Sequence, residues 1–134
     1  MNSYVCYMKA DHRPLDTTPL DLSPLLGDWV NLQANSHHVV RANLREQNGR
    51  LFLKSHGANA VNPIDWGEVE AIPYAMGTAL VANGFSAYYE LNGIRVHLVA
   101  NQKLGILVIC AYVSYFDQSE RVPHHTREFF QRNL

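Results

Sequence analysis

The sequence predicts an all-β protein whose strands form a closed, antiparallel, up-and-down barrel of about eight strands. From residue 25 onward, apolar and polar side chains alternate with a period of two, as they do in half-buried strands. Short turn-like segments join these strands without intervening helices, which excludes a parallel sheet. A meander of this kind protects its two edges best by closing into a barrel. The chain has 134 residues, 47% hydrophobic and 17% charged, and this composition is typical of one globular domain.

The chain divides into an extended N-terminal arm at residues 1–24 and a single barrel domain at residues 25–134. The arm contains three prolines, which each remove a backbone donor from any regular element: Pro14, Pro19 and Pro24. Its apolar stretch at residues 4–8 predicts a tail docked on the barrel. An added strand, a swapped segment or a lid is the alternative.

The first expected hairpin joins strands at residues 38–45 and 50–56. Residues 47–49, Gln-Asn-Gly, supply the turn, because asparagine and glycine tolerate a positive φ. A third strand is expected at residues 65–75. In this strand the two glutamates face water and the apolar residues between them face the interior: Glu68, Glu70, Val69 and Ala71.

The second half of the domain predicts another hairpin and a long apolar strand. Asn92-Gly93 is a strong turn signal between strands at residues 85–91 and 94–100. After a turn at residues 101–103, the run at residues 104–115 is apolar on both faces and must be covered on both. Its outer row would expose an apolar stripe, which favours a homodimer or coverage by the tail: Leu107, Ile109, Ala111 and Val113.

The tail at residues 117–134 contains the one helix that we expect, a short C-terminal helix. Thr126 is a suitable N-cap for about two turns, and Pro123 prevents an earlier start. The competing interpretation is an eighth strand that closes the sheet.

Alternation predicts which side chains face the barrel interior. Small residues in this set leave space, and a few polar atoms interrupt an apolar wall, which is the chemistry of a ligand pocket. A filled core is the alternative. The residues expected to line the pocket are Val40, Ala42, Leu44, Leu53, Ser55, Val69, Ala71, Ala87, Tyr89, Leu91, Val96, Leu98, Val108, Cys110 and Tyr112, and Leu51 shares their face.

The segment Leu-Gly-Asp-Trp-Val-Asn at residues 26–31 resembles the Gly-x-Trp motif of the calycin superfamily, which includes the lipocalins. Residues 65–68 and 127–130 also resemble small bacterial lipocalin-like proteins. The resemblance covers residues 25–134 and implies a barrel closed at one end by Trp29, with a late arginine packed across its ring. Arg121 and Arg127 are the candidates for that arginine. The chain lacks the disulfide pattern of secreted lipocalins and the helical lid of the fatty-acid-binding group, so no ligand type carries over.

Composition excludes several other classes. The formal net charge of −1 argues against nucleic-acid binding, and no window approaches the length of a membrane span. Cys6 and Cys110 form no metal or redox motif, and no signal peptide precedes them, so a cytoplasmic protein with reduced thiols is expected. The seven histidines show no chelating spacing, and we expect neither a metal nor a cofactor.

Two functions fit such a pocket. The first is a small-molecule binding protein that holds a hydrophobic ligand in the barrel interior. The alternative is a cofactor-independent cyclase or isomerase that folds a polyene or polyketide-like biosynthetic intermediate in the same cavity. Its candidate proton donors are Tyr89 and Tyr112, followed by Glu68 and Asp65. For Asp65 the favoured interpretation is structural, a turn residue that accepts backbone hydrogen bonds while Trp66 covers a barrel end.

Overall fold

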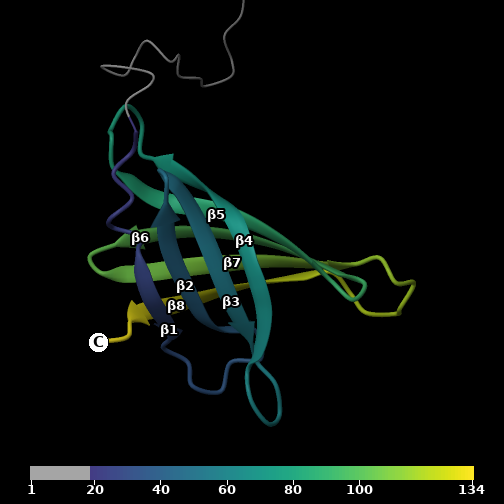
Figure 1. Cartoon of the computed structure of the whole chain (residues 1–134). Coiled ribbons are helices and arrows are strands. Elements are labelled where there is room, and N and C mark those ends of the chain that lie inside the picture. Colours follow the sequence, from purple (N-terminus) through teal and green to yellow (C-terminus); the bar gives the residue numbers. More distant parts are fainter. Residues whose placement is uncertain (1–18) are drawn as a thin grey trace, which may run out of the picture.

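Eight antiparallel strands close into a barrel in which each strand pairs with its sequence neighbours and the last pairs with the first (Figure 1). The structure is a computed structural model that describes residues 19–134, so the expected docking of residues 4–8 lies outside the described residues. The strands are β1 (Gly27–Asn31), β2 (Val39–Gln47), β3 (Arg50–Gly57), β4 (Ile64–Ala75), β5 (Ala82–Leu91), β6 (Ile94–Lys103), β7 (Ile106–Tyr115) and β8 (His124–Arg132). The predicted fold class is confirmed, apart from its helix.

One end of the barrel is closed by Trp29, which is fully buried. Its Nε1 donates to the carbonyl of Leu25 at 2.9 Å, and the guanidinium of Arg132 lies 4.4 Å from the ring centroid. Arg132 also donates to the carbonyls of Leu26 and Pro24, at 3.1 and 2.8 Å. The late arginine is therefore Arg132. The two candidates named from the sequence were wrong, since Arg121 lies over Tyr115 and Arg127 over Phe129.

The chain before β1 completes this closed end. Leu22 and Leu25 are buried in the core, and Asp21 forms a parallel bridge with Val81 at the start of β5. Backbone hydrogen bonds of 2.7 and 2.8 Å tie Asp21 to Leu80 and Ala82. The opposite end, where β4 begins and the β5–β6 and β7–β8 connections lie, is the mouth of the barrel (Figure 1).

Two of the expected hairpin turns are confirmed, and a third turn was missed. Asn48-Gly49 and Asn92-Gly93 each adopt positive φ at both residues. Leu104-Gly105 does the same, with φ of 55° and 81°, and it pairs Lys103 with Ile106. The expected three-residue turn at residues 101–103 was therefore displaced along the chain to residues 104–105 and shortened to two residues, and it was missed because a leucine rarely occupies this conformation.

The new position and length of this turn reverse the predicted faces of β7, because each residue of β6 now pairs with a residue of β7 that lies an odd number of positions further along the chain. Partners across a sheet share a face, so Ile106 lies outward with Lys103, and Val108, Cys110 and Tyr112 follow it outward. The residues that point inward instead are those expected on the surface: Leu107, Ile109, Ala111 and Val113. The apolar stripe that favoured a homodimer is therefore not on the surface, and dimerisation stays a prediction without that support.

The C-terminal segment is a strand, so the predicted helix is wrong and the competing eighth strand is correct. Phe130 is 1% exposed while its neighbour Phe129 is 43% exposed, which is the alternation of a strand. β8 pairs with β7 from Val113↔His124 to Ile106↔Gln131, and with β1 through Trp29↔Arg132. Sheet closure thus overrides the local helix signal at Thr126.

A bulge near the start of β2 corrects one further residue. The register between β2 and β3 shifts between Val39 and Arg41. Val39 is 3% exposed and takes the interior position, whereas Val40 lines a hollow on the outer surface together with Val30 and Arg41. Val40 is therefore not an interior residue.

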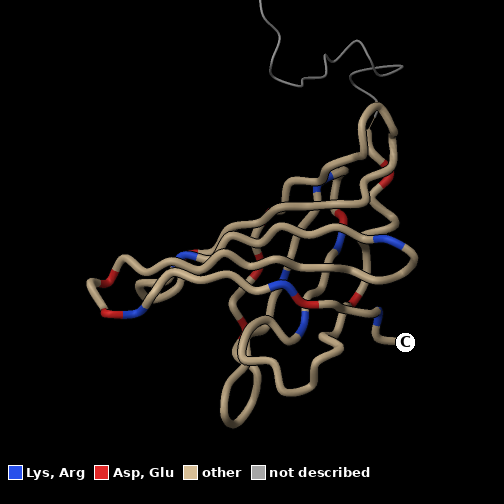
Figure 2. Tube along the Cα trace, turned by 180° about the vertical axis from the view of Figure 1, so that it is seen from behind, with Lys and Arg blue, Asp and Glu red and all other residues tan. Residues whose placement is uncertain are grey.

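The outer surface carries charges of both signs. Lysine and arginine are interspersed with aspartate and glutamate along the strands (Figure 2). Several of them pair across neighbouring strands, as in Arg41–Asp28, Arg50–Glu70 and Lys54–Asp65. Residues 19–134 contain no helix that could cross a membrane.

Candidate functional site: the mouth of the barrel

The mouth of the barrel holds a cavity of about 470 Å³. This volume falls within the usual range for small-molecule sites. The closed half of the barrel is filled by large buried side chains, among them Trp29, Phe85 and Phe130. The cavity is lined by residues from the strand ends and their connections: His37, His38, Ile64, Asp65, Trp66, Leu91, Asn92, Ile94, Val96, Val113, Tyr115 and His124.

Trp66 is held in the mouth by the absence of a side chain at Gly57. A Cβ at Gly57 would overlap Nε1 and Cε2 of the Trp66 indole. The indole also makes an edge contact with the ring of Tyr89, with the centroids 5.5 Å apart. Gly67, at φ +88°, then bends the start of β4, and its amide donates to Asp65 Oδ1 at 2.7 Å. A tight local turn therefore positions the largest aromatic surface of the cavity.

Tyr89 lies next to the cavity but its hydroxyl is engaged. The residue is 3% exposed, and its hydroxyl donates to the carbonyl of Gly67 at 2.9 Å. Burial raises the pKa of Tyr89, and the neighbouring Ser55 partly offsets the rise. Ser55 is itself fully buried, and its hydroxyl completes no hydrogen bond within the described residues. Tyr89 therefore serves as a neutral donor to the backbone that fixes the Gly67 turn.

Two histidines meet at the rim, His38 from the connection that precedes β2 and His124 from the first position of β8. The rings of His38 and His124 have centroids 5.6 Å apart, and Tyr115 lies 6.1 Å from His124. Burial lowers the pKa of His38, with Glu128 opposing that shift. Glu128 Oε1 accepts from Ser36 Oγ at 2.9 Å. Residues 19–134 bring no three potential metal ligands together.

The two carboxyl candidates for a general acid are both held in the charged form. Hydrogen bonds from the Gly67 amide and from Lys54 lower the pKa of Asp65. The Arg45 guanidinium lowers the pKa of Glu68, which it reaches at 2.5 and 2.7 Å. Acid catalysis would need a raised pKa, whereas the pKa of each of these carboxyls is lowered. Asp65 accepts a backbone hydrogen bond from Gly67, which is the contact that its structural interpretation expects.

The predicted lining residues fall into three groups. Leu91 and Val96 line the cavity. A larger group faces inward as expected but is packed within the core or against it: Ala42, Leu44, Leu53, Ser55, Val69, Ala71, Ala87, Tyr89 and Leu98. The third group lies on the outer surface and cannot act in the mouth: Val40, Val108, Cys110 and Tyr112, the last of them 52% exposed.

Several lining residues were not singled out from the sequence. His38, Tyr115 and His124 lie at strand ends, where the chain turns and alternation no longer assigns a face. Their common signal is position, since each flanks a connection on the same side of the barrel. Ile94 lines the cavity on the same face of β6 as Val96, whereas Arg95 between them is exposed.

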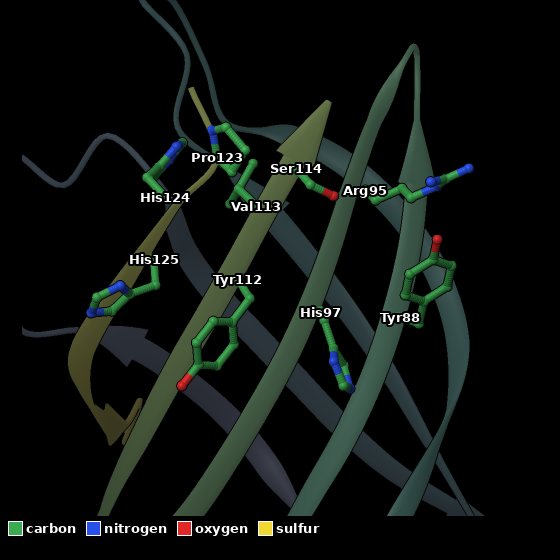
Figure 3. Close-up of a pocket in the computed structure, with 9 residues that line it drawn as sticks. All are labelled: Tyr88, Arg95, His97, Tyr112, Val113, Ser114, Pro123, His124 and His125. Atoms are coloured by element: carbon green, nitrogen blue, oxygen red, sulfur yellow. The ribbon is translucent and has the colours of Figure 1, made fainter. Parts of the chain in front are cut away.

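A second hollow, of about 430 Å³, lies on the outer surface of β5–β8 (Figure 3). Its floor is a row of directly paired residues from four neighbouring strands, Tyr88↔His97↔Tyr112↔His125. Tyr112 and His125 are stacked with their centroids 5.8 Å apart, while Tyr88 meets His97 edge-on at 6.5 Å. This row faces solvent. None of its four residues lines the mouth, although the outer hollow and the mouth share Val113 and His124 at their edges.

Comparison of the chain with protein-family models, with curated proteins and with solved structures found no match.

Proposed function

We propose that this protein binds a small hydrophobic molecule in the mouth of its barrel. The observation that carries the proposal is the apolar cavity of about 470 Å³, bounded by Trp66, Leu91 and Ile94 and open at only one end of a barrel whose other end is plugged. Apolar walls with a few polar atoms at the rim are typical of ligand sites. The Trp29–Arg132 plug supports a calycin-like barrel as the scaffold.

A cyclase or isomerase in the same cavity is the alternative, and the donor geometry gives it less support. The proton of Tyr89 is engaged with a backbone carbonyl, and Tyr112 lies on the other side of the sheet. Asp65 and Glu68 are charged and paired. The cavity therefore offers shape and burial but no free acid among these candidates, which favours binding over turnover.

Titration with N-phenyl-1-naphthylamine, an uncharged apolar fluorophore, tests the proposal. We expect saturable enhancement of its fluorescence at about pH 7.5, with a dissociation constant on the order of micromolar. Ile94→Trp fills the mouth and should weaken binding at least about tenfold.

Val99→Trp is the matched control, since Val99 lies on the same strand but faces outward and is 41% exposed. Equal loss in both variants, or no saturable binding to the wild type, would contradict a ligand site at the mouth.

A further inference from the structure

We infer that the mouth accepts an uncharged molecule and that protonation of His38 and His124 expels it. This inference rests on the proposed binding function and adds the charge of the ligand and a means of its release. It follows from the charges around the cavity and from the position of the two imidazoles.

The cavity offers no cation to an acidic ligand at neutral pH. Its lining includes no lysine or arginine among the described residues, and its one carboxylate is that of Asp65. Two cations close to lining residues are already paired, because Lys54 Nζ lies 3.2 Å from Asp65 and Arg121, which stacks on Tyr115, donates to Asp117 at 2.5 Å. An acidic ligand would therefore lose the hydration of its carboxylate without gaining a cationic partner, and it would lie near the negative charge of Asp65. Both effects cost binding free energy. A neutral apolar molecule meets neither penalty.

The histidines form the part of the rim that can change its charge. His38, immediately before β2, and His124, the first residue of β8, lie with their ring centroids 5.6 Å apart. Both imidazoles contribute aromatic surface to the cavity, and imidazole is the side chain that commonly changes its charge between about pH 5 and pH 8. When both are protonated, two like charges lie within 6 Å in a largely apolar opening.

Other titratable groups surround this pair on every neighbouring element. Glu128 on β8 attracts a charged His38, while His37 opposes it. Tyr115 on β7 contacts His124, and Arg121 stacks over the far side of that tyrosine at 4.2 Å. Asp65 lies across the mouth on β4, paired with Lys54. Glu128 also accepts a hydrogen bond from Ser36, and its single negative charge cannot balance two protonated imidazoles.

Ligand and protons therefore compete for the mouth. An apolar molecule that covers His38 removes water from the imidazole and disfavours its charged form. By linkage, protonation disfavours the ligand by the same factor. Because burial already holds the pKa of His38 below its ordinary value, release occurs on the acidic side of neutrality.

Titrations of N-phenyl-1-naphthylamine at about pH 7.5 and about pH 5 test this inference. We expect the wild type to bind about tenfold more weakly at the lower pH, the effect of about one unit of linked pKa change. The double variant His38→Gln, His124→Gln should bind equally well at both. The matched control is His97→Gln, His125→Gln on the outer row, which should keep the wild-type pH dependence.

A second probe tests the charge of the ligand. The anion 8-anilinonaphthalene-1-sulfonate should bind more weakly than the neutral fluorophore at about pH 7.5 and should gain affinity at about pH 5. Tighter binding of the anion at the higher pH would overturn the inference.

The remaining outcomes separate this inference from the proposed function. Binding of the neutral probe with the same affinity at both pH values overturns the histidine control but leaves the binding function intact. A loss of affinity at low pH that persists in the His38, His124 double variant also overturns it, since another group or acid unfolding is then responsible. Absence of binding at either pH contradicts the proposed function itself.

Discussion

Individual residues decide the two ends of this barrel. At the closed end, Arg132 both covers Trp29 and satisfies carbonyls of the chain that precedes β1. The sequence indicated that an arginine would fill this role but not which one, because the choice depends on how far β8 extends past β1. A strand that ends at Arg132 places only that arginine over the indole.

We expect Arg132→Ala to lower the free energy of unfolding by about 2 kcal/mol, since it removes charged hydrogen bonds and a cation–π contact and leaves carbonyls unpaired. Urea denaturation measures the change. Arg127→Ala is the control, because the guanidinium of Arg127 lies over the exposed ring of Phe129, and it should cost less than about 0.5 kcal/mol. Equal losses of unfolding free energy in the two variants would contradict a stabilising role for Arg132 at the closed end.

At the mouth, Gly57 is the residue on which the position of Trp66 depends. Gly57→Ala should displace the indole, weaken binding of the neutral fluorophore about tenfold or more, and destabilise the fold by about 1–3 kcal/mol. Titration and urea denaturation measure the two effects. In a Trp66→Ala background the indole that would clash is absent. Gly57→Ala should then have little further effect on probe binding or on the free energy of unfolding. A full effect in that background would show that the clash is not the cause.

At the scale of elements, alternation predicted the faces of strands that have one polar face. Glu68 and Glu70 set the faces of β4, and Arg95 and His97 set those of β6. β7 has no such marker, since both of its rows are apolar, and its faces depend on the turn that precedes it. That turn was not recognised from the sequence, because Leu104 occupies a position of positive φ that leucine rarely adopts. The end of β8 was ambiguous for another reason, because a helical signal of a few residues competes poorly with closure of a whole sheet.

Neighbouring phenylalanines test the assignment of β8 as a strand. Phe130→Ala should cost about 3–5 kcal/mol, because it empties a fully buried site. Phe129→Ala, on the opposite face, should cost less than about 1 kcal/mol. Urea denaturation of both variants gives the comparison, and similar costs would contradict the alternation of buried and exposed faces in β8.

At the scale of the whole molecule, pairing of surface carboxylates sets the response to acid. Arg41 lowers the pKa of Asp28, and the same direction holds for Asp65, Glu68, Glu70 and Asp117, each with a hydrogen-bonding partner. A group with a lowered pKa binds fewer protons when folded than when unfolded. Its contribution is therefore present above the ordinary carboxyl pKa and is lost as the pH falls through the folded value.

Asp28→Asn should accordingly cost more stability at about pH 7 than at about pH 2, because the wild-type carboxyl takes up a proton and loses its advantage as the pH falls. Urea midpoints of both proteins at the two pH values measure this difference. A cost that is independent of pH would show that the charge of Asp28 does not stabilise the fold.

The account as a whole depends on where an apolar molecule sits, and chemical-shift mapping of the ¹⁵N-labelled protein with N-phenyl-1-naphthylamine tests this most directly. We predict that the shifts concentrate at the mouth, on Trp66, Ile94, Val96 and Val113, and that they leave Tyr88, His97 and His125 on the outer row unchanged. Shifts confined to the outer row, or none at saturating probe, would contradict a ligand site inside the barrel.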